Sequence, residues 1–108
     1  MTMLSILLAA GLSSASSQLP VDPFLFGIGN EECKSALDPE RSLEREVWIM
    51  GAWSGLNAAS KKATGKGIDV FKLFAVIEDR CASNPSMLLM QVVLDVWLVL
   101  GATETGLR

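Results

Sequence analysis

The chain has 108 residues, of which 50% are hydrophobic and 19% are charged. This length allows one domain, and this composition excludes a disordered segment or a polyelectrolyte. The chain has nine basic and twelve acidic residues, and the resulting net charge of −3 disfavours binding to nucleic acid. The absence of histidine removes the commonest general base and metal ligand, so we expect neither an enzyme nor a protein that binds a metal or cofactor.

The N-terminal segment has an apolar run over residues 3–12 with no charged side chain before it. Such a run has the length of a signal-peptide hydrophobic region and is too short to span a bilayer. Small residues follow, so we expect cleavage after Ala15 or Ser17. The predicted organisation is a signal peptide over residues 1–17 and a small helical domain over residues 18–108, periplasmic or secreted and free of the membrane after cleavage. A buried N-terminal helix is the alternative, because no lysine or arginine precedes the run.

Two cysteines, Cys33 and Cys81, lie 48 positions apart. An exported chain meets an oxidising compartment, where an even number of cysteines usually forms bridges, so a disulfide between these two is predicted. The chain-entropy model gives closure of such a loop about 4 kcal/mol of stabilisation. The alternative is two buried free thiols in a helix bundle. An active redox pair is not indicated, because the chain has no Cys-x-x-Cys motif.

The first part of the mature chain is predicted to be extended. Residues 18–30 contain two prolines and two glycines around an apolar Phe-Leu-Phe-Gly-Ile patch that should pack against the domain. A short helix is expected to begin near Asn30 and to carry Cys33.

A long helix is predicted over residues 38–60, because its opening Asp-Pro pair supplies an N-cap acceptor and then a residue without an N–H. Gly51 and Gly55 lie one turn apart in its interior, where each costs about 1 kcal/mol relative to alanine. Close approach of another helix or of a ligand is the usual compensation. A helix break near Ser54 is the alternative.

Residues 60–67 contain three lysines and two glycines and are expected to form a solvated loop that ends the long helix. An anion-binding site formed by the three lysines is the alternative. Asp69 is the predicted N-cap of the next helix, which carries its apolar residues and Cys81 on one face.

The last helix is predicted over about residues 85–100, with Asn84 or Ser83 as N-cap and Pro85 as the first helical residue. It is apolar nearly all round, which is typical of a helix that is central in the core or that pairs with a partner. A homodimer through this helix is therefore expected. Residues 101–108 are expected to fray.

The chain also resembles a known class of proteins. The long helix carries Trp48, Gly51, Trp53, Ser54, Gly55 and Asn57, and Cys81 is followed after two residues by Asn84 and Pro85. With the first cysteine near the mature N-terminus, this pattern over about residues 30–95 resembles the HdeA/HdeB-like periplasmic acid-stress chaperones and the Tai-type immunity proteins of type VI secretion. The resemblance implies an exported, compact all-α bundle of about four helices pinned by one disulfide. The chain departs from the acid chaperones in its more hydrophobic last helix and in having no tail of lysines.

Trp53 and Asn57 lie one turn apart and share a face of the long helix. In one interpretation, Trp48 and Trp53 anchor the core and Asn57 supports the end of the helix. In the other, the indole, the amide and the neighbouring Gly51 and Gly55 bind a peptide or protein segment.

These observations favour a non-catalytic exported binding protein, such as an immunity or inhibitor protein that acts by contact with a protein partner. The negative net charge suits a basic partner. An acid-activated periplasmic chaperone is the first alternative, because neutralising twelve acidic side chains below about pH 3 moves the net charge from −3 to about +9. A small structural subunit whose last helix docks in a larger assembly is the second alternative.

Overall fold

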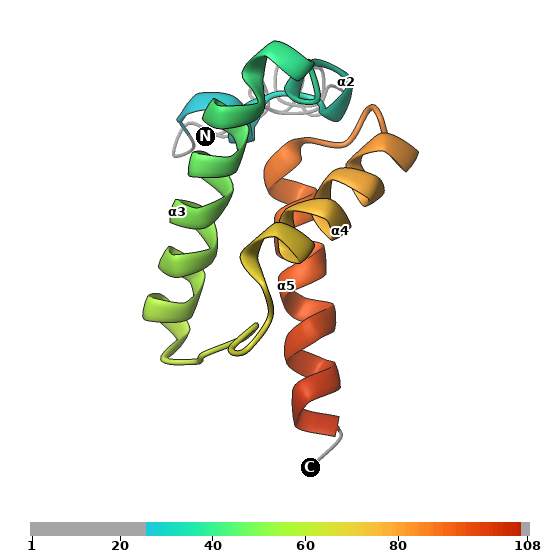
Figure 1. Cartoon of the computed structure of the whole chain (residues 1–108). Coiled ribbons are helices and arrows are strands. Elements are labelled where there is room, and N and C mark those ends of the chain that lie inside the picture. The colour runs from blue at the N-terminus through green and yellow to red at the C-terminus, as the bar shows by residue number, and fades with distance from the viewer. Residues whose placement is uncertain (1–25, 107–108) are drawn as a thin grey trace, which may run out of the picture.

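The computed structural model describes residues 26–106, and side chains up to residue 103. Within this range the chain forms four α-helices and two 3₁₀ helices and no β-strand: η1 (Gly27–Asn30), α2 (Cys33–Ala36), η2 (Pro39–Arg41), α3 (Ser42–Ser60), α4 (Val70–Ser83) and α5 (Leu89–Gly106). Figure 1 shows α3 and α5 as the two long helices, α4 packed on α5, and α2 across one end. The predicted all-α bundle of about four helices is confirmed. The predicted signal peptide lies outside the described residues.

The start of α2 is set by a contact with a distant segment. The N–H groups of Cys33 and Lys34 donate to the carbonyls of Met87 at 2.7 Å and Pro85 at 3.0 Å. These bonds satisfy N–H groups that have no partner inside the helix. The prediction of a helix start near Asn30 is therefore wrong by three residues, because the preceding residues form the 3₁₀ turn η1.

The two aspartate caps are confirmed. The carboxylate of Asp38 accepts the N–H of Glu40 at 2.9 Å, and the carboxylate of Asp69 accepts the N–H of Phe71 at 2.7 Å. Asp38 caps the short helix η2, which leads directly into α3. The other end of α3 is closed by Lys61 in the left-handed conformation, at φ 58°.

The prediction that Asn84 and Pro85 start the last helix is wrong. Asn84 is the C-cap of α4: its N–H donates to the carbonyl of Cys81 at 3.0 Å, and its side chain donates to the carbonyl of Arg80 at 2.8 Å. Pro85 lies in the following turn, where its carbonyl accepts a hydrogen bond from α2. The Asn-Pro pair therefore ends one helix and supports another.

Helix α5 begins four residues later than predicted and continues further. The N–H of Leu88 donates to the side chain of Gln91 at 2.8 Å, which is one half of a capping box. Residues 101–106 are helical, although fraying was predicted from residue 101. Gly101 lies near the buried Thr64, because a Cβ atom at Gly101 would be 3.5 Å from Thr64 Oγ1. This contact with the loop after α3 extends the packed part of the helix.

The predicted disulfide is present. Cys33 of α2 and Cys81 of α4 are bonded, with their Cα atoms 5.3 Å apart, and both residues are fully buried. The core around them is apolar and draws on every long helix, with Ile28, Ala36, Ile49, Phe74, Ile77, Leu89, Val92 and Val93 among its members. The bridge therefore ties α2 to α4 at the centre of the packing.

Helix α5 is buried on one side only. Val92, Val93 and Val96 face the core, whereas Leu94 and Leu98 remain exposed. The apolar character noted in the sequence thus serves the core on one side and leaves an apolar surface on the other.

Candidate protein-interaction surface

Trp53 and Asn57 fix the loop that follows α3. The indole N–H of Trp53 is buried and donates to the carbonyl of Thr64 at 2.8 Å, and the amide nitrogen of Asn57 donates to the same carbonyl at 3.2 Å. The amide oxygen of Asn57 accepts the indole N–H of Trp97 at 2.8 Å. The polar groups of these two residues are therefore used to join α3, the loop and α5.

Gly51, Ser54 and Gly55 are exposed instead. Beyond the adjacent residues and the nearby backbone of α3 itself, a Cβ atom added at Gly51 or at Gly55 would have no heavy atom within 4 Å. The expected approach of another helix is thus not made by the part of the chain that the structure describes. Helix α3 also continues through Ser54 without the alternative break.

We call the exposed residues of α3 between residues 43 and 59 the outer face; it consists of Leu43, Glu44, Val47, Met50, Gly51, Ser54, Gly55, Ala58 and Ala59. Leu43, Val47 and Met50 are 75%, 54% and 44% exposed. No charged residue occurs between Glu46 and Lys61. A helix face that meets only water normally carries charged and polar residues, so this composition is typical of a face that is covered by a partner.

A groove of about 480 Å³ runs along one flank of the outer face. Its lining is almost entirely apolar and consists of Phe26, Trp48, Gly51, Ala52, Gly55, Leu56 and Met90. The indole N–H of Trp48 donates to the carbonyl of Phe26 at 2.9 Å, which fixes the ring as a wall of the groove. The ring also lies on Gly29, where an added Cβ atom would be 1.8 Å from Trp48 Cζ2. The side chain of Phe26 is 81% exposed at the mouth.

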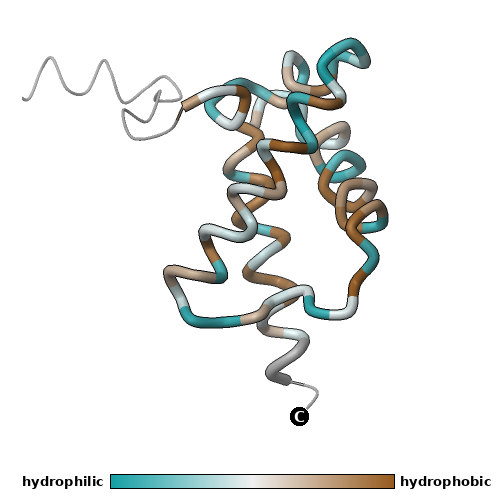
Figure 2. The backbone as a smooth tube through the Cα atoms, turned by 60° about the vertical axis from the view of Figure 1, so that its left-hand side comes forward, coloured by the Kyte–Doolittle hydropathy of each residue, from teal (hydrophilic) through white to brown (hydrophobic). Residues whose placement is uncertain are grey.

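Charge is segregated to the two ends of α3. Residues 26–46 carry six carboxylates and three basic side chains, whereas residues 61–72 carry four lysines and one carboxylate. The rise of the helix from Glu46 to Lys61 separates the two groups by about 22 Å. Figure 2 shows α3 as mostly white to brown between hydrophilic segments at its two ends. Apart from Glu44 near its acidic end, the outer face is therefore uncharged, and it lies between an acidic segment and a basic segment.

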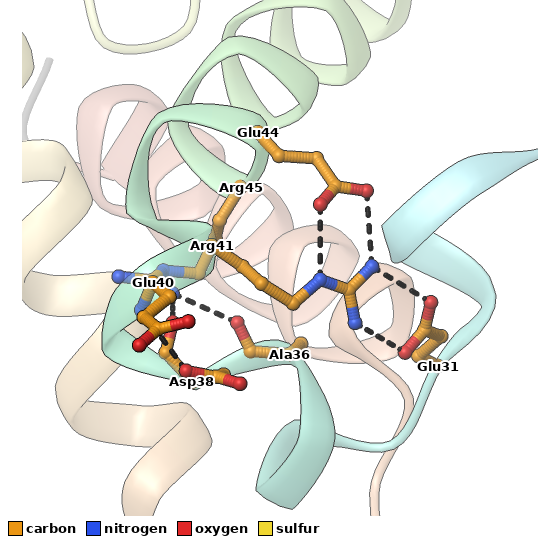
Figure 3. Close-up of polar contacts among 7 residues, drawn as sticks. All are labelled: Glu31, Ala36, Asp38, Glu40, Arg41, Glu44 and Arg45. Carbon is orange, nitrogen blue, oxygen red and sulfur yellow. Dashed lines mark hydrogen bonds and ion pairs between the residues drawn. The ribbon is translucent and has the colours of Figure 1, made fainter.

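An arginine clamp, formed by Arg41 with Glu31 and Glu44, stands at the acidic end (Figure 3). The guanidinium group donates to both oxygens of Glu31 at 2.6 and 2.9 Å and to both oxygens of Glu44 at 2.9 Å. These hydrogen bonds hold the pKa of each carboxyl below its ordinary value. The clamp thus ties the segment before α2 to the first turn of α3 while the carboxylates are ionised.

Arg45 is a structural residue that the sequence analysis missed. Its side chain is buried, and it donates to Glu78 of α4 at 2.9 Å and to the carbonyl of Ala36 at 2.8 Å. Its four-residue spacing from Ile49 and Trp53 places it on the buried side of α3. That spacing could have identified Arg45 as an internal cation, whereas its charge suggested a surface position.

A second opening of about 660 Å³ lies between α4 and α5. Val76, Val96 and Val99 supply apolar surface there, and Arg80 and Asp95 form an ion pair near it. It shares no lining residue with the outer face of α3 or its groove. None of the motif residues found in the long helix belongs to this opening.

The described residues contain no group of three or more histidine, cysteine, aspartate or glutamate side chains that could hold a metal ion. Among the same residues, no helix combines the length and the hydrophobicity needed to cross a membrane. No protein-family model, curated protein or solved structure matches the chain. The geometry of the outer face and of its groove is thus the main guide to function.

Proposed function

We propose that this protein is a non-catalytic binding protein that acts through protein–protein contact at the outer face of α3. The observation that carries the proposal is the long outer face, whose only charged residue is Glu44 and which is exposed even though the chain has a packed, disulfide-bonded core. Interface centres are depleted of charged residues and enriched in aromatic residues and methionine. Phe26, Trp48 and Met50 supply such residues at and beside this face.

A role as an exported immunity or inhibitor protein fits this proposal. It is supported by the resemblance of the long-helix pattern to the Tai-type immunity proteins and by the signal peptide expected over residues 1–17. An inhibitor of this kind needs a rigid complementary surface and no reacting group. The disulfide and the Trp53–Asn57 network would provide that rigidity.

Site-specific photocrosslinking in native extracts tests the proposal. A photoreactive amino acid at Val47, on the outer face, should give a discrete adduct with a protein. The same amino acid at Ala75, on the exposed side of α4, is the matched control and should give none. Adducts of equal yield at both positions, or no adduct at Val47, would count against the proposal.

An acid-activated chaperone is the second candidate, and the arginine clamp favours it. Because the folded-state pKa values of Glu31 and Glu44 are lowered, the stability that the clamp provides is present at neutral pH and is lost as the pH falls through those values. Loss of the clamp would loosen the N-terminal segment beside the apolar groove. Light scattering by an aggregating client protein at low pH, with and without this protein, tests the idea. Equal scattering would eliminate it.

A further inference from the structure

We infer that the outer face of α3 binds a second copy of this chain, with the two α3 helices antiparallel and the two-fold axis at Gly51. The inference rests on the proposed function, because it names the partner of the same surface. It is carried by two features of α3: the distribution of side-chain size and the distribution of charge along the helix.

Side-chain size along the outer face is complementary to itself. The row of exposed residues at four-residue spacing is Leu43, Val47, Gly51, Gly55 and Ala59, so large side chains precede Gly51 and small ones follow it. Such a row turns by about 40° around the helix for each four residues, so only the residues near its centre face a neighbouring helix together. In an antiparallel pair centred on Gly51, Val47 meets the partner's Gly55, whereas Leu43 and Ala59 lie at the two edges of the contact. The larger side chain of the central pair thus faces a small residue, and the same patch serves both copies.

The space beside the glycines is open in a single copy. Because no heavy atom lies within 4 Å of a Cβ position at Gly51 or Gly55, the backbone of another helix can approach there. Met90 of α5 borders the groove, and Leu94 lies one turn further along the same side of α5 at 38% exposure. The last helix, expected from its sequence to form a homodimer, would therefore flank the contact, with α3 at its centre.

The charges at the two ends select the antiparallel arrangement. The acidic end of one copy, with six carboxylates and three basic side chains, would lie beside the partner's four lysines and single carboxylate. Two-fold symmetry repeats this attraction at the other end. A parallel pair would place acidic beside acidic and basic beside basic. A partner unrelated to this chain would fit equally well only if it carried the same acidic and basic segments and the same change in side-chain size along its contact face.

Sedimentation of the purified chain over a range of concentrations tests the inference. The wild-type chain should form a dimer, and Gly51→Glu should raise its dissociation constant by at least about tenfold, because two carboxylates would meet at the axis. Glutamate suits a helix interior better than glycine does, so the variant should stay folded, which circular dichroism checks. Ala75→Glu adds the same charge on α4 and should leave the dissociation constant unchanged. A chain that stays monomeric up to about 1 mM overturns the inference, as does an equal effect of both substitutions.

Disulfide trapping tests the register. Gly51→Cys should link to its own copy under oxidising conditions, because only a residue at the axis meets itself. Val47→Cys and Gly55→Cys should each fail to self-link and should link to one another when the two variants are mixed. Efficient self-linking of Val47→Cys would contradict the antiparallel register.

The mass of the photocrosslinked adduct at Val47 separates the two claims. An adduct of twice the mass of the chain supports the inference, and of the proposed function it supports the assignment of the outer face as a protein-contact surface. An adduct with a different protein, from a chain that sediments as a monomer, overturns the inference and leaves the proposed function standing. No adduct and no dimer overturn both.

Discussion

Replacing Gly51 and Gly55 by alanine tests whether the outer face of α3 is open in a single folded copy. Both glycines lie inside a 19-residue helix, and a Cβ atom at either position meets no heavy atom within 4 Å. Alanine therefore introduces no clash, and its higher helix propensity contributes about 1 kcal/mol at each site. We expect Gly51→Ala/Gly55→Ala to raise the free energy of unfolding of the monomer by about 2 kcal/mol and its Tm by about 10 °C.

Gly29→Ala is the internal contrast, because this glycine is covered. Its added Cβ atom would lie 1.8 Å from Trp48 Cζ2, so the indole ring would have to move. That movement breaks the hydrogen bond from Trp48 to the carbonyl of Phe26. Overpacking together with this lost bond should lower the free energy of unfolding by about 3 kcal/mol.

Equilibrium denaturation in guanidinium chloride measures both effects, with tryptophan fluorescence and circular dichroism as the two probes. It should be done at a concentration at which sedimentation shows the monomer. The same double variant should weaken self-association, since the added methyl groups lie where the second copy approaches. A double variant that is less stable than wild type, or a Gly29→Ala variant of wild-type stability, would refute the description of these surfaces.

Three other predictions concern the elements that hold the fold. Replacing both Cys33 and Cys81 by alanine should lower the free energy of unfolding by about 4 kcal/mol in urea denaturation, and a loss below about 1 kcal/mol would speak against a bridge closing a long loop. Arg45→Met should lower the free energy of unfolding by about 3 kcal/mol in the same measurement, because the half-buried carboxylate of Glu78 and the carbonyl of Ala36 lose their hydrogen-bond donor. An unchanged free energy of unfolding would show that the cation is dispensable. Arg41→Met removes the arginine clamp, so the variant should be less stable than wild type at pH 7. That difference should shrink as the pH falls below about 4.5 and the carboxylates of the clamp become protonated, as denaturation curves at several pH values would show; a difference independent of pH would contradict the lowered pKa values.

Much of this fold could be predicted from local sequence. Asp38 and Asp69 place a side-chain acceptor where a helix needs one, and these caps depend only on residues two positions away. The pairing of Cys33 with Cys81 followed from their number and from the expected compartment. The caps are set by short-range chemistry, and the cysteine pairing follows by elimination because there are only two cysteines. A single sequence is therefore enough to predict both.

The start of the last helix depends on long-range contacts and could not be predicted in the same way. Asn84 and Pro85 have the residue types of an N-cap and a first helical position, yet Asn84 closes α4 and Pro85 accepts a hydrogen bond from α2. The hydrogen bond to Pro85 exists only once the segment before α5 lies against α2. The contact with α2, and not the local residue preference at positions 84 and 85, therefore decides where the last helix begins.

The candidate site shows the same division. The sequence identified Gly51 and Gly55 as residues that need a close neighbour, and their spacing placed them on one face. It could not show that this face is left open by the described residues, nor that Asn57, from the same motif, is occupied with Thr64 and Trp97. Whether a motif residue points inward or outward depends on the packing of the other helices.

The reactivity of a cysteine on the outer face, measured at native abundance, tests the central claim most directly. Ser54→Cys changes one atom at an exposed position, and Ala75→Cys provides a reference on α4. If the outer face is covered by protein in its native setting, a maleimide should modify the thiol at position 54 much more slowly than the one at position 75, and dilution of the purified chain to monomer should abolish the difference. Equal rates at the two positions before dilution would show that nothing covers this face.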